Sequence, residues 1–155
     1  MRRLIIPFLV LASVSQVAFS KPKNISFISE RMTNQTLDLG TTGASMGDIT
    51  VNTGNLLDAK TNATIGTYIS RKTMIVTNGL NGTDTRDTST QYDLPQGTVS
   101  MTDMSTYTTG NSFPAMPQER AIVGGTGKYS GAKGVAVITP MTNRPGALYV
   151  TLKFE

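Results

Sequence analysis

The sequence lacks cysteine, histidine and tryptophan altogether among its 155 residues. Without cysteine there is no disulfide framework, no thiol nucleophile and no cysteine metal site. Without histidine the chain lacks the commonest metal ligand and general base, which excludes Ser-His-Asp hydrolases and the usual zinc hydrolases. Any acid–base chemistry must therefore use Asp, Glu, Lys, Tyr or water.

Charge is also sparse, and the formal net charge is only +4. Proteins that follow a nucleic-acid backbone gather their basic side chains on one face, because they must neutralise successive phosphates. Here the basic residues are scattered along the chain, as in Arg31, Lys60, Arg71, Lys72, Arg86, Lys128 and Arg144. We therefore expect no nucleic-acid partner.

The N-terminus has the pattern of an export signal. Arg2 and Arg3 precede the apolar run 4–12, and Ala18-Phe19-Ser20 offers the small residues that a signal peptidase recognises. We expect cleavage before Lys21, which makes the protein secreted or periplasmic.

A membrane anchor is the alternative interpretation of the same run. A spanning helix needs roughly 17 to 25 apolar residues, and Ser13, Ser15 and Gln16 interrupt this one too early. The sequence thus predicts a signal peptide at 1–20, no stable membrane span, and a single domain at 21–155.

The composition and patterning of residues 21–155 predict an all-β fold. The segment is rich in Thr, Gly, Ser and Asn, and apolar and polar side chains alternate along it. The polar run 78–90 holds two Asn-Gly pairs and is interpreted as a mobile loop. The expected strands are 24–39, 47–52, 63–77, 91–94, 97–107, 120–123, 134–139 and 147–154. About eight short strands without a helix favour a closed antiparallel barrel, because closure removes exposed edges; a sandwich is the alternative.

The glycine-rich segment 124–128 invites a phosphate-loop interpretation. Ile122 and Tyr129 occupy positions where that motif needs Gly and Ser or Thr, and Ser130 replaces the third glycine of a dinucleotide fingerprint. The glycines instead predict positive φ angles, a bulge and close backbone approach between strands. No nucleotide cofactor is expected.

Residues 119–134, with the Gly124-Gly125-Thr126-Gly127 turn, resemble the C-terminal signature of dirigent proteins and its counterpart in allene oxide cyclases. A second match follows the order of motifs in both families: Gly47-Asp48-Ile49-Thr50-Val51, then Asn55-Leu56-Leu57-Asp58, then Ile65-Gly66. The resemblance implies an eight-stranded antiparallel barrel with an apolar cavity, usually a homotrimer. Both families bind a reactive intermediate and steer its ring closure or coupling without a redox cofactor.

The chain departs from the allene oxide cyclases at their functional positions. Aligned on the first strand, Phe27 and Ser29 replace a glutamate and an asparagine, Gly54 replaces an asparagine, and Lys72 lies near a cavity cysteine. Authentic allene oxide cyclase activity is therefore not expected.

Three residues are candidates for catalysis. Glu30 is a candidate general acid or base, or else an outer residue in a surface ion pair. Arg71 is a candidate anchor for a carboxylate or enolate; on an outer face it would instead pair across a subunit interface. Tyr68 is a candidate proton donor to a developing oxyanion, or else a packing residue. No cofactor-binding or metal-binding residues are predicted.

The functional hypothesis is an exported barrel that binds a small apolar intermediate and directs its cyclisation or coupling as a cofactor-free isomerase or cyclase. The alternatives are a non-catalytic, lipocalin-like carrier of a small hydrophobic molecule, and a barrel with a structural or interaction role. A buried charge that faces the ligand would favour chemistry, whereas a purely apolar lining would favour storage.

Overall fold

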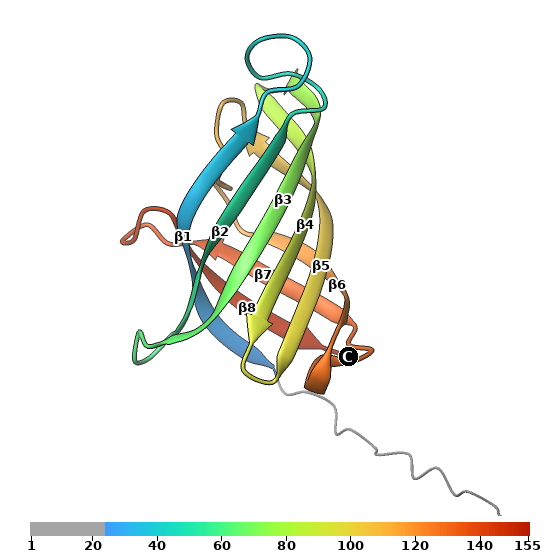
Figure 1. The fold of residues 1–155 in the computed structure, drawn as a ribbon. Coiled ribbons are helices and arrows are strands. Elements are labelled where there is room, and N and C mark those ends of the chain that lie inside the picture. The colour runs from blue at the N-terminus through green and yellow to red at the C-terminus, as the bar shows by residue number, and fades with distance from the viewer. Residues whose placement is uncertain (1–23) are drawn as a thin grey trace, which may run out of the picture.

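The computed structural model describes residues 24–155, and the predicted signal peptide lies outside them. The described chain forms eight strands that pair antiparallel in sequence order, and β1 also pairs with β8 to close the barrel (Figure 1). The strands are β1 (Ile25–Leu37), β2 (Ile49–Asp58), β3 (Thr64–Gly79), β4 (Thr83–Leu94), β5 (Gly97–Thr108), β6 (Gln118–Gly125), β7 (Gly134–Pro140) and β8 (Ala147–Phe154), with a 3₁₀ turn η1 (Gly127–Tyr129). This confirms the eight-stranded antiparallel barrel. Among residues 24–155, no helix is long and apolar enough to cross a membrane.

The predicted loop at 78–90 is wrong, because β4 begins at Thr83. The real turn is shorter, and its left-handed residues are Asn78, Asn81 and Gly82, with φ of 49°, 62° and 64°. The first half of β4 points polar side chains into the barrel, so it shows no apolar alternation from which a strand could be predicted.

The glycine turn after β6 behaves as predicted. Gly127 has φ of +57°, and Gly97 on the neighbouring turn has φ of +134°. A Cβ on Gly97 would lie 2.1 Å from the carbonyl oxygen of Thr126, so only glycine allows these two backbones to approach so closely.

One half of the barrel interior is an apolar core. Phe27 packs edge-on against Tyr92, with ring centroids 5.0 Å apart, and Tyr129 of η1 stacks on Phe154 at 5.7 Å. Burial of these side chains is the main favourable contribution to folding. The fully buried members of this core include Leu56, Val99, Met101, Ala136, Ile138, Val150 and Leu152.

The other half of the interior is polar, which differs from the apolar cavity that the resemblance implied. Its buried polar side chains are Asn52, Ser70, Lys72, Asp84, Arg86, Thr88, Thr90, Ser105 and Arg120. A buried charge is tolerated only with partners, so this half must contain a network of polar contacts.

Candidate functional site at the barrel mouth

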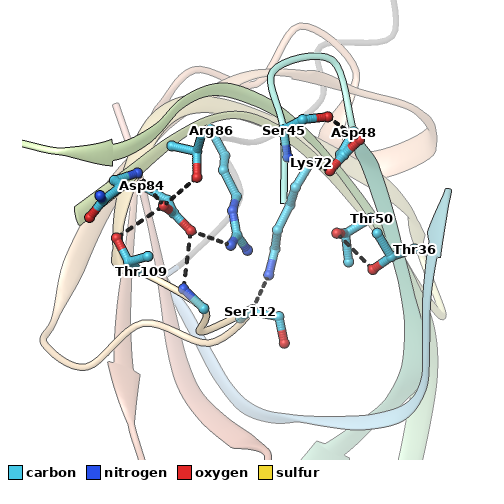
Figure 2. A network of polar contacts seen from close by, with 12 residues as sticks. Thr36, Ser45, Asp48, Thr50, Lys72, Asp84, Arg86, Thr109 and Ser112 are labelled. Carbon is cyan, nitrogen blue, oxygen red and sulfur yellow. Dashed lines mark hydrogen bonds and ion pairs between the residues drawn. The ribbon is translucent and has the colours of Figure 1, made fainter. Parts of the chain in front are cut away.

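A pocket of about 420 Å³ opens at the polar end of the barrel. Its walls are the β1–β2 loop, the inner faces of β3 and β4, and the start of the β5–β6 loop; Lys72, Arg86 and Asp84 are among its lining residues (Figure 2). Pockets of this volume hold small organic ligands in other proteins. A groove of about 370 Å³ on the outer face around Met32 and Ile69 has no comparable group of buried charges. We therefore take the mouth pocket as the candidate site.

Lys72 enters the pocket from β3. It lies on the same inward face as Tyr68 and Ser70, and only 4% of its surface is exposed. Its Nζ donates a hydrogen bond to the carbonyl oxygen of Ser112 at 2.6 Å and lies 4.9 Å from the centre of the Tyr107 ring. Burial, reinforced by three nearby arginines, lowers the pKa of Lys72 to about 7. The ammonium and the neutral amine are therefore both accessible near neutral pH.

Arg86 and Asp84 form a buried ion pair on β4, with Nη2 and Oδ2 3.1 Å apart. Asp84 also accepts hydrogen bonds from the backbone N–H groups of Asn78 and Gly110 and from the Thr109 hydroxyl (Figure 2). Burial alone would raise the pKa of Asp84, but these hydrogen bonds and Arg86 outweigh it and keep the pKa below its usual value. Asp84 thus stays ionised and ties two loops to the pocket wall.

Arg120 approaches from β6. Its Nη1 donates to the Thr90 hydroxyl and its Nη2 to the Tyr107 hydroxyl, both at 3.2 Å. Arg86 also lies against the face of the Tyr107 ring, with its Cζ 4.8 Å from the ring centroid. Tyr107 therefore contacts the Lys72, Arg86 and Arg120 side chains together; we call these three the cation cluster.

The acidic groups at the rim do not balance the cation cluster. Asp48 accepts hydrogen bonds from the backbone N–H groups of Leu39 and Ser45, both at 2.8 Å, and Asp38 accepts one from Gly43. Both carboxylates thus stabilise their own loop, the one between β1 and β2. Asp84 is the acidic residue that pairs directly with the cluster.

The segment 109–117, which we call the cover, closes the interior beside the pocket. Arg31 holds it, donating from Nη1 to the Ser112 hydroxyl at 3.0 Å and lying 5.3 Å from the Phe113 ring centre. Phe113 and Pro114 line a void of about 20 Å³ that Tyr68 and Arg120 also border. That is room for about one water molecule, so with the cover closed the space for a ligand is the mouth pocket.

Of the three predicted catalytic residues, the structure brings only Tyr68 into the interior. Tyr68 lies edge-on to Tyr92 at 6.1 Å, and burial raises its pKa, an effect that Ser29 and Arg31 partly offset. Glu30 lies on the outer face, where Arg144 contacts it at 2.8 Å, and Arg71 is exposed on the outer face of β3. The three do not form one site, and their catalytic roles stay predictions.

The positions aligned with the cyclases' functional residues do face inward. Phe27, Ser29, Gly54 and Lys72 are all buried in the barrel. Lys72, Arg86 and Arg120, which the structure brings together, were not among the predicted catalytic residues. The alternation of side chains along a strand could have identified Lys72, because Lys72 lies on the same face as Tyr68 whereas Arg71 lies on the opposite face.

The mouth is lined by two cations, Lys72 and Arg86, and by three carboxylates, which belong to Asp38, Asp48 and Asp84. All three carboxylates already accept hydrogen bonds from backbone N–H groups of the chain. In the described part of the chain, no group of three or more Asp and Glu side chains that could hold a metal ion gathers. The chemistry that this arrangement offers is stabilisation of negative charge on oxygen, together with proton exchange at Lys72.

No protein-family model and no curated protein matches the sequence. Solved structures do match. A pyocyanin demethylase is 18% identical and superposes with a TM-score of 0.69, over 85% of this chain and 99% of that one. The Diels-Alderase AbmU from Streptomyces koyangensis is 16% identical, with a TM-score of 0.64 over 85% of this chain and 64% of that one. The pterocarpan synthase dirigent protein GePTS1 is 14% identical, with a TM-score of 0.56 over 94% of both chains. At such identities the likeness establishes the fold alone: the chain shares its barrel with these cyclases and dirigent proteins, which fits the barrel that the resemblance implied.

Proposed function

We propose that this protein is an exported barrel that binds a small, largely apolar intermediate at its mouth and directs the intermediate's cyclisation or coupling without a cofactor. Structures of the same fold include a Diels-Alderase, a cyclase that catalyses [4 + 2] cycloaddition, and a dirigent pterocarpan synthase. The observation that carries the proposal is the cation cluster, which brings buried donors to the wall of a ligand-sized pocket.

Shape supplies the first part of the mechanism. A flexible molecule held in one folded conformer has its reacting atoms close together, which converts an unselective reaction into a stereoselective one. Met74 and the β1–β2 loop offer apolar and backbone contacts for the body of such a molecule. Gly110 and Ser112 of the cover form part of the wall against which such a molecule would pack.

Electrostatics supplies the second part. Lys72 and Arg86 line the pocket as donors that are already in place when negative charge develops on a carbonyl or phenolic oxygen. Lys72 has a pKa of about 7, so near neutral pH it is able to give or accept a proton. A buried charge facing the ligand favours chemistry over simple storage, because a carrier of an apolar ligand needs no such group.

Assembly as a homotrimer, which the resemblance implied, is part of the proposal. Met32 and Ile69 are exposed by 63% and 48% on the outer face, beside the groove described above. Apolar side chains gathered in this way on a soluble surface are typical of contact areas.

Native mass spectrometry of the protein purified from its own host tests the binding step. We expect a retained small organic molecule and an assembly of three chains. A ligand-free monomer would contradict the proposal.

The steering step is tested by mixing the uncyclised precursor of the retained molecule with the barrel. We expect a ratio of product stereoisomers that differs from the ratio in buffer. The variant Lys153→Met removes an exposed charge on the outer face of β8 and should behave as the wild type. An isomer ratio equal to that in buffer would indicate a carrier instead.

A further inference from the structure

Some buried donors of the cation cluster have no acceptor. Within residues 24–155, Nε and Nη1 of Arg86 and Nε of Arg120 are buried without a hydrogen-bond partner. Buried polar groups in folded proteins are almost always paired, because an unpaired donor keeps the full cost of its desolvation. Two of these three nitrogens belong to Arg86, a residue of the mouth-pocket wall, so this wall holds donors for which residues 24–155 supply no acceptor.

The charge balance points to the sign of that acceptor. Lys72, Arg86 and Arg120 lie around the Tyr107 ring, and Arg31 approaches Lys72 from β1. Asp84 is the carboxylate in contact with the cluster, and its oxygens also receive backbone and hydroxyl donors. A buried excess of positive charge is unfavourable until an anion compensates it.

Two of the cations form part of the pocket wall, although each is more than nine-tenths buried. Lys72 and Arg86 both line the mouth pocket, and their side chains extend in the same direction with their ends side by side near Ser112 (Figure 2). Arg86 contacts Asp84 through Nη2 alone, which leaves its other nitrogens unpaired. Within the described residues, the Lys72 ammonium donates one hydrogen bond, to the Ser112 carbonyl oxygen.

We infer that the mouth pocket binds a molecule with a carboxylate, which lies between the Lys72 ammonium and the Arg86 guanidinium while the apolar part extends toward Met74. The carboxylate competes with the Ser112 carbonyl for Lys72, so binding loosens the cover at this residue. This inference rests on the proposed ligand pocket and adds the chemical class of the ligand. Charge-assisted hydrogen bonds of this kind are roughly twice as strong as neutral ones.

The affinity should also depend on pH. The charged groups around Lys72 are Arg31 from β1, Asp84 and Arg86 from β4 and Arg120 from β6, with Tyr107 of β5 beneath it. Asp38 and Asp48 of the β1–β2 loop line the same pocket. Among these, Lys72 has its pKa near neutrality. Carboxylate affinity should therefore fall as pH rises from 6 to 9, because Lys72 loses its charge.

Three eight-carbon probes test the inference by titration calorimetry at pH 6.5: octanoate, octanol and octylammonium. They share one apolar chain and differ in the head group. We expect octanoate to bind at least tenfold more tightly than either of the others. Equal affinities for octanoate and octanol, or no binding of octanoate, would overturn the inference.

Variants locate the site. Lys72→Met should weaken octanoate at least tenfold and leave octanol binding unchanged, whereas Lys153→Met should change neither. Because Arg86→Met alone leaves Asp84 unpaired, the double variant Asp84→Asn/Arg86→Met provides a second test that removes both charges of the pair. Unchanged octanoate affinity in Lys72→Met and in the double variant would place the carboxylate elsewhere.

Failure of the carboxylate site can be distinguished from failure of the proposed steering function. A neutral molecule retained in native mass spectrometry and converted stereoselectively, together with weak octanoate binding, would refute the carboxylate site and leave the steering function intact. Tight octanoate binding without stereoselective conversion would support the site and contradict the steering.

Discussion

The Lys72 ammonium lies 2.6 Å from the carbonyl oxygen of Ser112, and this contact joins the inner face of β3 to the cover. The same side chain borders both the mouth pocket and the small void beneath Phe113. Lys72 therefore separates the open part of the interior from the closed part, and its charge state affects both.

Replacement of Lys72 by Met should change how stability depends on pH. In the folded protein burial and the neighbouring arginines lower the pKa of Lys72 from 10.5 to about 7. Between these values the unfolded chain binds more protons, so the free energy of unfolding of the wild type rises with pH. Each pKa unit is worth about 1.4 kcal/mol, which gives a rise of up to about 5 kcal/mol across the window.

Thermal unfolding between pH 7 and 9.5 measures this effect. We expect Lys72→Met to flatten the rise and to be more stable than the wild type at pH 7. Lys153→Met should retain the wild-type slope. A Lys72→Met protein whose stability still rises as steeply would show that another group is responsible.

Asp84→Asn should destabilise the fold by about 3 kcal/mol, because it leaves the buried Arg86 without its counter-charge. It also weakens the acceptor that holds Asn78 and Gly110. The pKa of Asp84 is lowered, so its stabilising contribution is complete above the usual value of 3.8 and is lost as pH falls below it.

Chemical denaturation at pH 7 and at pH 3 measures the loss of stability in Asp84→Asn and the dependence of the Asp84 contribution on pH. Asp93→Asn is the matched control, since Asp93 is an exposed residue of the same strand. If Asp84→Asn and Asp93→Asn lost equal stability, the buried ion pair would not be a structural determinant.

The sequence predicted the barrel better than it predicted the interior. The alternation of Leu148, Val150 and Leu152 reflects an apolar inner face, so β8 was predictable to its ends. In β4 the inner positions hold Asp84 and Arg86, whose burial depends on partners from distant segments. Side-chain alternation cannot reveal such a strand, because its partners are known only after the chain has folded.

The outer face of β1, on which Glu30 lies, also carries a buried apolar residue. Ile28 shares its face and is 95% buried, yet it packs outside the barrel in a small cluster with Leu57 and Ala147. The β7–β8 loop covers this cluster, and its Arg144 contacts Glu30. A buried apolar residue on the same face as Glu30 therefore does not place that face inside the barrel.

Glu30→Gln tests the predicted catalytic role directly. The Glu30 and Arg144 side chains are each about a third exposed, and ion pairs of this kind contribute about 1 kcal/mol or less. We expect a small loss in the free energy of unfolding and an unchanged stereoisomer ratio in the conversion assay. A changed ratio with unchanged stability would instead support the general acid or base role.

Gly54→Ala tests the packing that carries Tyr68 into the interior. A Cβ on Gly54 would lie 1.9 Å from the carbonyl oxygen of Glu30 and 2.7 Å from the Tyr68 ring. The oxygen belongs to the backbone of β1, so the strands themselves must separate, and we expect a loss of about 3 kcal/mol by chemical denaturation. Gly124→Ala is the control, because a Cβ there meets nothing within 4 Å and should change stability by less than about 0.5 kcal/mol. Equal stability of the two variants would mean that β1 and β2 are spaced more widely at Gly54 than these contacts require.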